Sequence, residues 1–316
     1  MTRECGAVLF CLFIGLTVAV DPLPASMMRG VAITPDGPFT LEYYATMIQL
    51  DEALNIGANW VFVNTYLSQM NVTSSTVFKG PQAPLDSALK SFIDVAHSKG
   101  LKVMLKPIVI PLDDTSWLLL DPENPSEWFE SYTNVLCSYG TLLPGLDAYS
   151  VGLELTSLTI PHNYTNNWLQ LISRVRQCSN AKLTYSSLFS LEWRRIQFWD
   201  ELDWIGIDEY LPVSSSSNPY PSVAEMTDTI AEYFEQVRNF QVQQNLTSKP
   251  IVITETGIYS FTNATFSPAV FPPGVRRCND SYSTHANFTT QQLYFEATFN
   301  AVQLNSDIIS GIFMYQ

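Results

Sequence analysis

Short apolar runs rich in β-branched residues alternate with helical segments along most of this 316-residue chain. Runs of this kind predict parallel strands buried on both faces, with the intervening helices packed outside them. We interpret eight of the runs as strands: 29–33, 59–63, 101–105, 148–155, 182–185, 204–207, 250–254 and 309–314. The predicted helices cover 41–56, 87–98, 126–138, 223–243 and 289–304, with an amphipathic helix around 168–175.

Eight strands alternating with helices, without a break in composition, predict an α/β fold with one (β/α)8 TIM barrel over residues 27–316. The alternative is a doubly wound open sheet. Such a sheet normally carries a glycine-rich phosphate-binding turn after its first strand, and the segment Ile33-Thr-Pro-Asp-Gly37 is not one. The sequence stops just after the eighth predicted strand, so we expect a barrel without its last helix. The irregular segment 257–288 is expected to lie over the active-site face.

The charge balance narrows the range of partners. A net charge of −14 disfavours nucleic acid and anionic membranes, so a neutral substrate is expected. The chain has only three histidines, His97, His162 and His285, and no metal-ligand spacing among them. We therefore expect neither a metal nor another cofactor.

The N-terminus has the features of a signal peptide over residues 1–20. Arg3 precedes an apolar run from Ala7 to Val20, which is too short to span a membrane. A buried or anchoring helix is the alternative. The prediction is a protein that is secreted, or delivered to the lumen of the secretory or endolysosomal pathway, with no membrane contact after cleavage. Six glycosylation sequons agree with this route: Asn71, Asn163, Asn245, Asn263, Asn279 and Asn287.

Three cysteines remain after signal cleavage: Cys137, Cys178 and Cys278. Cys137 and Cys178 lie toward the ends of the helices that follow the third and fourth strands, and both are expected to project toward the bottom of the barrel. An oxidising compartment favours a disulfide between them. Two buried free thiols are the alternative, and Cys278 is expected to stay unpaired.

Two of the predicted strands end on a glutamate. The runs are Val151-Gly-Leu-Glu154-Leu and Ile251-Val-Ile-Thr-Glu255-Thr-Gly. A carboxylate at the end of a buried run is costly unless it is paired, exposed at a cleft or catalytic. In a (β/α)8 barrel the C-terminal ends of the strands meet at one face. Two carboxylates there predict glycoside hydrolysis, in which one donates a proton and the other acts as nucleophile or base.

Several segments at these strand ends make the prediction more specific. They resemble glycoside hydrolase family 113, whose members are clan A barrels acting on β-1,4-mannans, and the resemblance runs from about residue 29 to the end in the family's motif order. The matching segments are Val103-Met-Leu-Lys106-Pro107, Val151-Gly-Leu-Glu154-Leu, Trp168-Leu-Gln-Leu-Ile-Ser-Arg-Val-Arg176, the stretch from Phe198 to Pro212, and Ile253-Thr-Glu255-Thr-Gly257.

The resemblance implies a role for each polar residue. Glu154 would be the acid/base and Glu255 the nucleophile, because the acid must hold a proton near neutral pH and the nucleophile must be ionised. Tyr210 would hydrogen-bond the nucleophile, and Lys106 and Asp208 would orient the sugar or tune the carboxylates. The alternative is structural: Asp208 pairs with Lys106, and the glutamates form ordinary salt bridges.

The chain also departs from the clan A pattern. Leu153 stands where an asparagine usually precedes the acid/base residue, and the eighth strand ends in Met314-Tyr315 rather than in tryptophan. Both changes bear on substrate identity more than on reaction type. Loop tryptophans are candidates either for stacking on sugar rings or for simple packing. These are Trp117, Trp193 and Trp199.

The sequence therefore predicts a secreted, retaining glycoside hydrolase, expected to be a monomer. Its substrate would be a β-1,4-linked neutral polysaccharide or oligosaccharide, with mannan first and β-glucan second. The alternative from another class is a catalytically silent carbohydrate-binding protein on the same barrel. The presence of both glutamates favours the enzyme.

Overall fold

The computed structural model describes residues 23–35, 37, 41, 49–261, 263–270 and 287–315, apart from the side chain of His162. The expected signal peptide, Cys278 and the sequon at Asn279 lie outside these residues. In the described part, eight parallel strands form a closed barrel in the order β1-β2-β4-β5-β6-β7-β8-β9, and β1 pairs with both β2 and β9. The predicted TIM barrel is confirmed.

The strands of the barrel follow the predicted order along the chain. A short additional strand, β3, pairs antiparallel with the far end of β2. The bounds are β1 Met28–Ile33, β2 Trp60–Gln69, β3 Phe78–Lys79, β4 Lys102–Pro111, β5 Ala148–Leu153, β6 Lys182–Leu188, β7 Ile205–Glu209, β8 Ile251–Thr256 and β9 Ile309–Met314.

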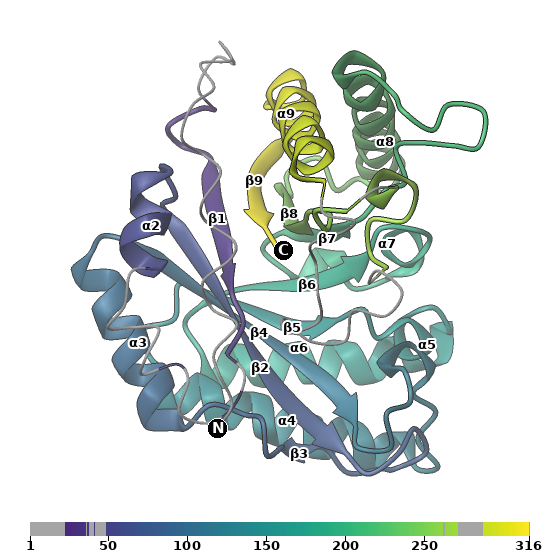
Figure 1. Cartoon of the computed structure of the whole chain (residues 1–316). Coiled ribbons are helices and arrows are strands. Elements are labelled where there is room, and N and C mark those ends of the chain that lie inside the picture. Colours follow the sequence, from purple (N-terminus) through teal and green to yellow (C-terminus); the bar gives the residue numbers. More distant parts are fainter. Residues whose placement is uncertain are drawn as a thin grey trace.

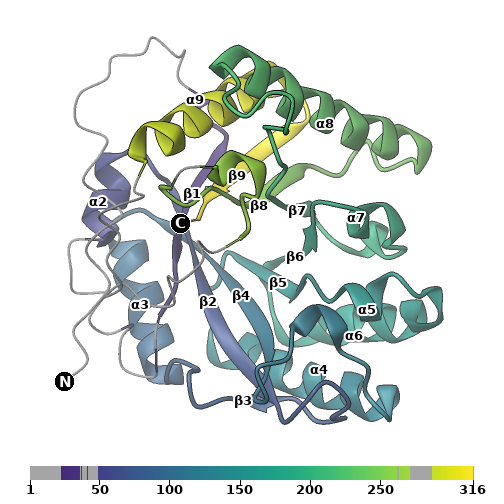
Figure 2. The same ribbon diagram turned by 45° about the vertical axis from the view of Figure 1, so that its right-hand side comes forward.

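The longer helices lie outside the ring of strands, with α3, α4 and α6 along one side and α8 beside α9 on another (Figures 1 and 2). None of the helices within the described ranges is both long and apolar enough to cross a membrane. The α-helices are α2 Gln49–Asn55, α3 Asp86–Ser98, α4 Pro125–Leu142, α5 Thr156–Thr159, α6 Thr165–Cys178, α7 Glu192–Arg195, α8 Val223–Gln243 and α9 Phe288–Leu304. Single 3-10 turns are η1 Trp117–Leu119, η2 His162–Tyr164, η3 Trp199–Glu201 and η4 Ala264–Phe266.

Local sequence explains where the helices begin and end. Helix α8 begins with a capping box, in which the Ser222 hydroxyl accepts from the Glu225 backbone N–H and the Glu225 carboxylate accepts from that of Ser222. Gly57 and Gly100 follow α2 and α3 at φ of 84° and 82°. A glycine adopts this left-handed conformation without the steric cost that a Cβ brings, and so ends each helix.

Two strands extend well past their predicted ends. The prediction ended them at residues 63 and 105, but β2 and β4 pair over ten residues, from Trp60 with Lys102 to Gln69 with Pro111. Each supplies the hydrogen-bonding edge that lets the other continue. Lys106 therefore lies in the middle of β4, in register with Asn64 of β2.

Aromatic side chains fill the lower part of the barrel. Trp60 of β2 and Trp204, just before β7, meet edge to face with ring centroids 5.9 Å apart. Phe313 of β9 contacts Trp60 at 6.1 Å, and both tryptophans are buried. The barrel is thus closed beneath the site by side chains from opposite walls. The interior cluster is Trp60, Phe62, Met104, Ala148, Trp204, Val252 and Phe313.

One disulfide joins two neighbouring helices. Cys137 of α4 and Cys178, the last residue of α6, are bonded with their Cα atoms 5.4 Å apart. The predicted pairing is confirmed, although Cys137 lies more than a turn before the end of its helix.

The described sequons differ in exposure. Asn71, Asn163, Asn245 and Asn263 are exposed, and Asn287 is half-buried. The Asn287 side-chain oxygen caps α9 by accepting from the Thr290 backbone N–H at 3.0 Å. Glycosylation at these positions stays a prediction.

Candidate active site

Glu255 is held at both oxygens by side chains from β4 and from the residue after β7. It lies near the end of β8, and its Oε1 accepts from Lys106 Nζ at 2.7 Å. Its Oε2 accepts from the hydroxyl of Tyr210, which follows β7, at 2.8 Å. Both partners are buried and fix the orientation of the carboxyl group. Glu255 itself is 7% exposed.

Lys106 connects Glu255 to a second acid. Its Nζ lies 3.1 Å from Asp208 Oδ1 and 3.2 Å from the Thr254 carbonyl oxygen, so the ammonium has three acceptors. The same Nζ lies 4.6 Å from the centroid of the Phe62 ring. Asp208 also accepts from the Thr254 hydroxyl at 2.6 Å. The structural pair of Lys106 and Asp208 is present, and it is part of a cluster with Glu255.

The second glutamate, Glu154, comes from the end of β5. It is the first residue after β5 and has a φ of 49°, a left-handed conformation that is unusual for a residue with a Cβ. Its backbone N–H donates to the Ser186 carbonyl of β6 at 2.8 Å. The side chain is 8% exposed.

Burial and mutual repulsion raise the pKa values of two acids in this group. Burial raises the pKa of Glu154 well above its usual range, and the charges of Asp208, Glu255 and Glu192 raise it further, whereas Lys106 lowers it. Burial also raises the pKa of Asp208 to about 7, against the opposing effect of Lys106. The cluster has more acids than cations, so Glu154 tends to hold a proton near neutral pH.

The arrangement supplies the two groups that glycoside cleavage needs. Glu154 is a buried carboxyl group with a raised pKa, and Glu255 is a carboxyl group oriented by two donors. Across the described residues there is no group of three or more histidine, cysteine, aspartate or glutamate side chains arranged to hold a metal ion. The chemistry available at this end of the barrel is that of paired carboxyl groups.

Comparison with known families agrees with this geometry. The profile of Glycoside Hydrolase Family 113 matches residues 35–316, which is most of the chain. The chain belongs to glycoside hydrolase family 113. A search of curated proteins finds no match.

Solved structures similar to the chain include other family 113 members. A GH113 β-1,4-mannanase is 22% identical with a TM-score of 0.73, covering 92% of this chain and 88% of that one. The GH113 β-mannanase AaManA from Alicyclobacillus acidocaldarius, in complex with ManMIm, is 21% identical with a TM-score of 0.73, covering 92% and 87%. A β-glucuronidase from Ruminococcus gnavus is 12% identical with a TM-score of 0.59, covering 92% and 44%. At these identities the likeness shows the barrel fold.

In this family 113 chain, two predicted sugar-stacking residues are core residues instead. Trp193 is 0% and Trp199 is 1% exposed, so neither ring can contact a substrate. The Trp193 Nε1–H donates to the Phe189 carbonyl at 3.0 Å, and the Arg194 guanidinium covers the ring at 4.6 Å. The Trp199 Nε1–H donates to the Trp193 carbonyl at 2.9 Å. Stacking is therefore wrong and packing holds for both, because Trp193 on α7 and Trp199 on η3 have their side chains turned inward.

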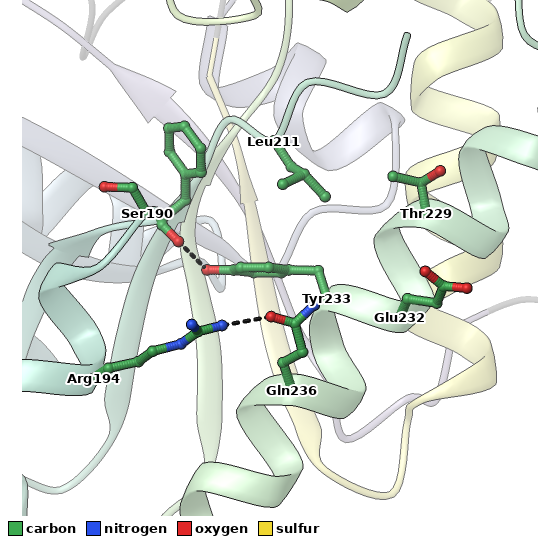
Figure 3. A pocket seen from close by; sticks show the side chains of 8 residues that line it. Ser190, Arg194, Leu211, Thr229, Glu232, Tyr233 and Gln236 are labelled. Atoms are coloured by element: carbon green, nitrogen blue, oxygen red, sulfur yellow. Dashed lines mark hydrogen bonds between the residues drawn. The ribbon is translucent and has the colours of Figure 1, made fainter. Parts of the chain in front are cut away.

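A hollow of about 270 Å³ lies above this packing, between α7, α8 and the segments after β6 and β7 (Figure 3). Arg194 reaches across it to Gln236, and the Tyr233 hydroxyl donates to the Phe189 carbonyl at 2.8 Å. The same carbonyl accepts from Trp193. The hollow is thus backed by groups that fix Trp193 in place, and its lining includes none of the clustered acids.

Trp117 differs from the other two loop tryptophans. It is half-buried in η1, which packs against α5 directly after Glu154 through a hydrogen bond of 3.1 Å from the Thr156 hydroxyl to the Leu118 carbonyl. Its Nε1 has no hydrogen-bond partner among the described residues. Stacking on a sugar stays a prediction for Trp117.

Tyr315 follows the last strand of the barrel, where clan A barrels usually have a tryptophan. Its ring stacks on that of Phe62, with the ring centroids 6.1 Å apart and an interplanar angle of 27°.

Two buried acids beside the site have no role assigned from the sequence. Glu192 of α7 and Glu209 of β7 are both 0% exposed. Glu209 accepts from the Leu211 backbone N–H and the Thr256 hydroxyl, each at 2.8 Å. Their partners come from separate segments of the chain, so no local pattern marks them. The only sequence signal was their position, with Glu192 in the segment after β6 and Glu209 at the end of β7.

Proposed function

We propose that this protein is a retaining glycoside hydrolase that cleaves β-1,4-mannan by double displacement. Glu255 attacks the anomeric carbon while Glu154 protonates the leaving oxygen. Glu154 then removes a proton from the water that releases the sugar from Glu255. The observation that carries the proposal is the contrast between the two acids. Glu255 is fixed by Lys106 and Tyr210, whereas Glu154 is buried with a raised pKa.

Mannan is the first substrate because the similar family 113 structures are named as β-mannanases. β-Glucan is the second. Leu153 and Tyr315 stand at positions that help define the sugar site in clan A, and they favour testing both polymers. Release of reducing ends from panels of mannan and glucan gives the substrate class.

The two glutamates are assigned by azide rescue on an activated aryl glycoside. Glu255→Ala should lose turnover, and azide should restore a product of inverted configuration, because azide takes the place of the nucleophile. Glu154→Ala should still form the glycosyl-enzyme with a good leaving group and give a retained azide product. Glu123→Ala, at an exposed glutamate, is the control and should keep full activity. Equal loss without rescue in both active-site variants would refute the assignment.

The specific alternative is a catalytically silent carbohydrate-binding protein. The two clan A departures, Leu153 and Tyr315, favour it. A silent protein would retain oligosaccharide in isothermal titration and release no reducing ends. Turnover that disappears in Glu255→Ala would exclude it.

The proposal includes a secreted protein acting outside the cytosol. Support comes from the disulfide of Cys137 and Cys178, since structural disulfides persist in oxidising compartments, and from the exposed sequons at Asn71, Asn245 and Asn263. Expression in a eukaryotic host should give glycosylated protein in the medium. Its mass should fall on treatment with an N-glycosidase.

A further inference from the structure

The turn that carries Glu154 is held by hydrogen bonds at each backbone position. Leu155 has φ of −79° and ψ of 55°, and the Thr156 N–H donates back to the Glu154 carbonyl at 2.8 Å, which forms an inverse γ-turn. The preceding φ of 49° at Glu154 is strained for a residue with a Cβ. Such a conformation persists only where the surroundings fix it.

A tyrosine outside the barrel supplies one of these fixed points. The Leu155 N–H donates to the hydroxyl oxygen of Tyr185 at 2.6 Å. Tyr185 is on β6 and is 0% exposed, with its ring edge to face against Trp168 at 5.4 Å. The ring lies so close to β5 that a Cβ on Gly152 would be 2.7 Å from it. Its hydroxyl therefore has little freedom to move away from the turn.

A buried glutamate fixes the tyrosine in turn. The Tyr185 hydroxyl donates to Glu192 Oε1 at 2.6 Å. Glu192 also accepts from the Thr159 hydroxyl at 2.6 Å and from the Leu188 N–H at 2.7 Å. Because the Tyr185 proton points to Glu192, its lone pairs face the Leu155 N–H. The chain of donors then runs in one direction, from the turn to the carboxyl group.

We propose that Tyr185 and Glu192 are positioning residues for the acid/base Glu154, holding its carboxyl group against the leaving oxygen from behind the barrel wall. The inference rests on the proposed function, in which Glu154 donates the proton. Neither residue touches the substrate. Their effect is confined to the step in which Glu154 transfers a proton.

Glu192 also acts on Glu154 through its charge, in addition to the hydrogen bonds. The charged groups that act on Glu154 are Asp208 of β7, Glu255 of β8, Glu192 of α7 and Lys106 of β4. The charge of Glu192 raises the pKa of Glu154, and burial raises the pKa of Glu192 to about 7. Glu192 faces the Tyr185 hydroxyl and the Thr159 hydroxyl, and its own helix carries Arg194 and Arg195, which are exposed.

Tyr185→Phe tests the positioning role, with Tyr149→Phe as the matched control. Tyr149 is buried on the adjacent strand β5, and its hydroxyl donates to the Leu136 carbonyl of α4 at 3.0 Å, away from the turn. Each variant removes one buried hydroxyl. We compare kcat/KM on a β-1,4-mannooligosaccharide, whose leaving group needs the acid, with kcat/KM on a dinitrophenyl β-mannobioside, whose leaving group does not.

Tyr185→Phe should lower kcat/KM on the oligosaccharide about 10- to 100-fold and leave the dinitrophenyl substrate within about twofold. Tyr149→Phe should change both substrates alike and little. An equal loss on both substrates in Tyr185→Phe, or no loss beyond that of Tyr149→Phe, would overturn the proposal.

Glu192→Gln adds a pH profile that a purely structural role would not move. Removing the negative charge lowers the pKa of Glu154, so the basic limb of kcat/KM on the oligosaccharide should shift to lower pH. The limb should be unchanged in Tyr149→Phe, and an unchanged limb in folded Glu192→Gln would contradict the electrostatic route. If Glu192→Gln does not fold, the substrate comparison in Tyr185→Phe decides alone.

Glu154→Ala separates failure of this inference from failure of the proposed function. If Glu154→Ala shows the difference between substrates and Tyr185→Phe does not, the positioning role alone is refuted. If Glu154→Ala shows no such difference, Glu154 is not the acid and both proposals are refuted.

Discussion

Lys106 is fully buried and forms ion pairs with two carboxyl groups. Its ammonium contacts Asp208 and Glu255 and lies over the Phe62 ring. A buried charge group of this kind contributes little net stability as a whole, but removing one partner leaves the others uncompensated. Lys106 therefore decides whether two acids can be ionised side by side at this end of the barrel.

Lys106→Met should lower the free energy of unfolding by about 3–5 kcal/mol at pH 8. The loss should be smaller at pH 5, because Asp208, whose pKa is raised to about 7, can then take up a proton. Urea unfolding at the two pH values measures this. Lys182→Met is the control, since Lys182 is 64% exposed and its pair with Asp203 should contribute about 0–1 kcal/mol. An equal loss at both pH values would contradict the expectation.

Individual site residues differ in how far the sequence could predict them. Glu154 and Glu255 could be found because each directly interrupts an apolar strand. Trp193 was placed wrongly because the four-residue helix α7 is too short to show a buried face. Glu192 was missed because its acceptors are used by Thr159, Tyr185 and Leu188, which the sequence does not bring together.

At the scale of elements, the sequence predicts where strands and helices exist better than where they end. The bounds of α8 and β9 agree with the prediction, and α8 begins at the capping box of Ser222 and Glu225. The ends of β2 and β4 do not, because each strand continues only while the other pairs with it. Strand β3 depends on that extension of β2.

The disulfide between α4 and α6 gives the prediction at this scale. Replacing both Cys137 and Cys178 with serine should lower the free energy of unfolding by about 4 kcal/mol in the chain-entropy model, because the bond closes a loop with a sequence separation of 41 residues. Activity at 25 °C should be unchanged, since the clustered acids lie on other elements. Thermal unfolding and turnover of the double variant check this. A loss of activity without a loss of stability would contradict it.

At the scale of the whole molecule, the local sequence pattern does not predict that the sheet closes into a barrel. The alternation of strands and helices fits an open sheet as well. What distinguishes the two is that β1 pairs with both β2 and β9, and its pairing with β9 joins residues 283 positions apart, such as Met28 and Gly311. The absence of a phosphate-binding turn favoured the barrel only indirectly.

The buried acids should make the stability of the protein depend on pH. Burial raises the pKa of Asp208 and of Glu192 to about 7 and raises that of Glu154 and Glu209. The folded state thus binds protons that the unfolded chain releases between about pH 4 and 7, so stability falls as pH rises through that window.

We expect the free energy of unfolding to fall by on the order of 5 kcal/mol from pH 5 to pH 8. Below about pH 4 it should fall again, because Asp203 and Asp307 have lowered pKa values that favour their ionised forms. Urea unfolding across this range measures the curve. Asp208→Asn should flatten its upper part, and stability that rises toward pH 8 would refute the expectation.

The contact between Trp60 and Trp204 has a spectroscopic consequence. β2 and β7 stand on opposite sides of the ring of eight strands, so the two indoles meet only across the full width of the closed barrel. Indole transitions at this separation couple and give a paired signal in circular dichroism. The molecule therefore carries an intrinsic optical reporter of ring closure, which can be followed during refolding separately from the signal of helix formation.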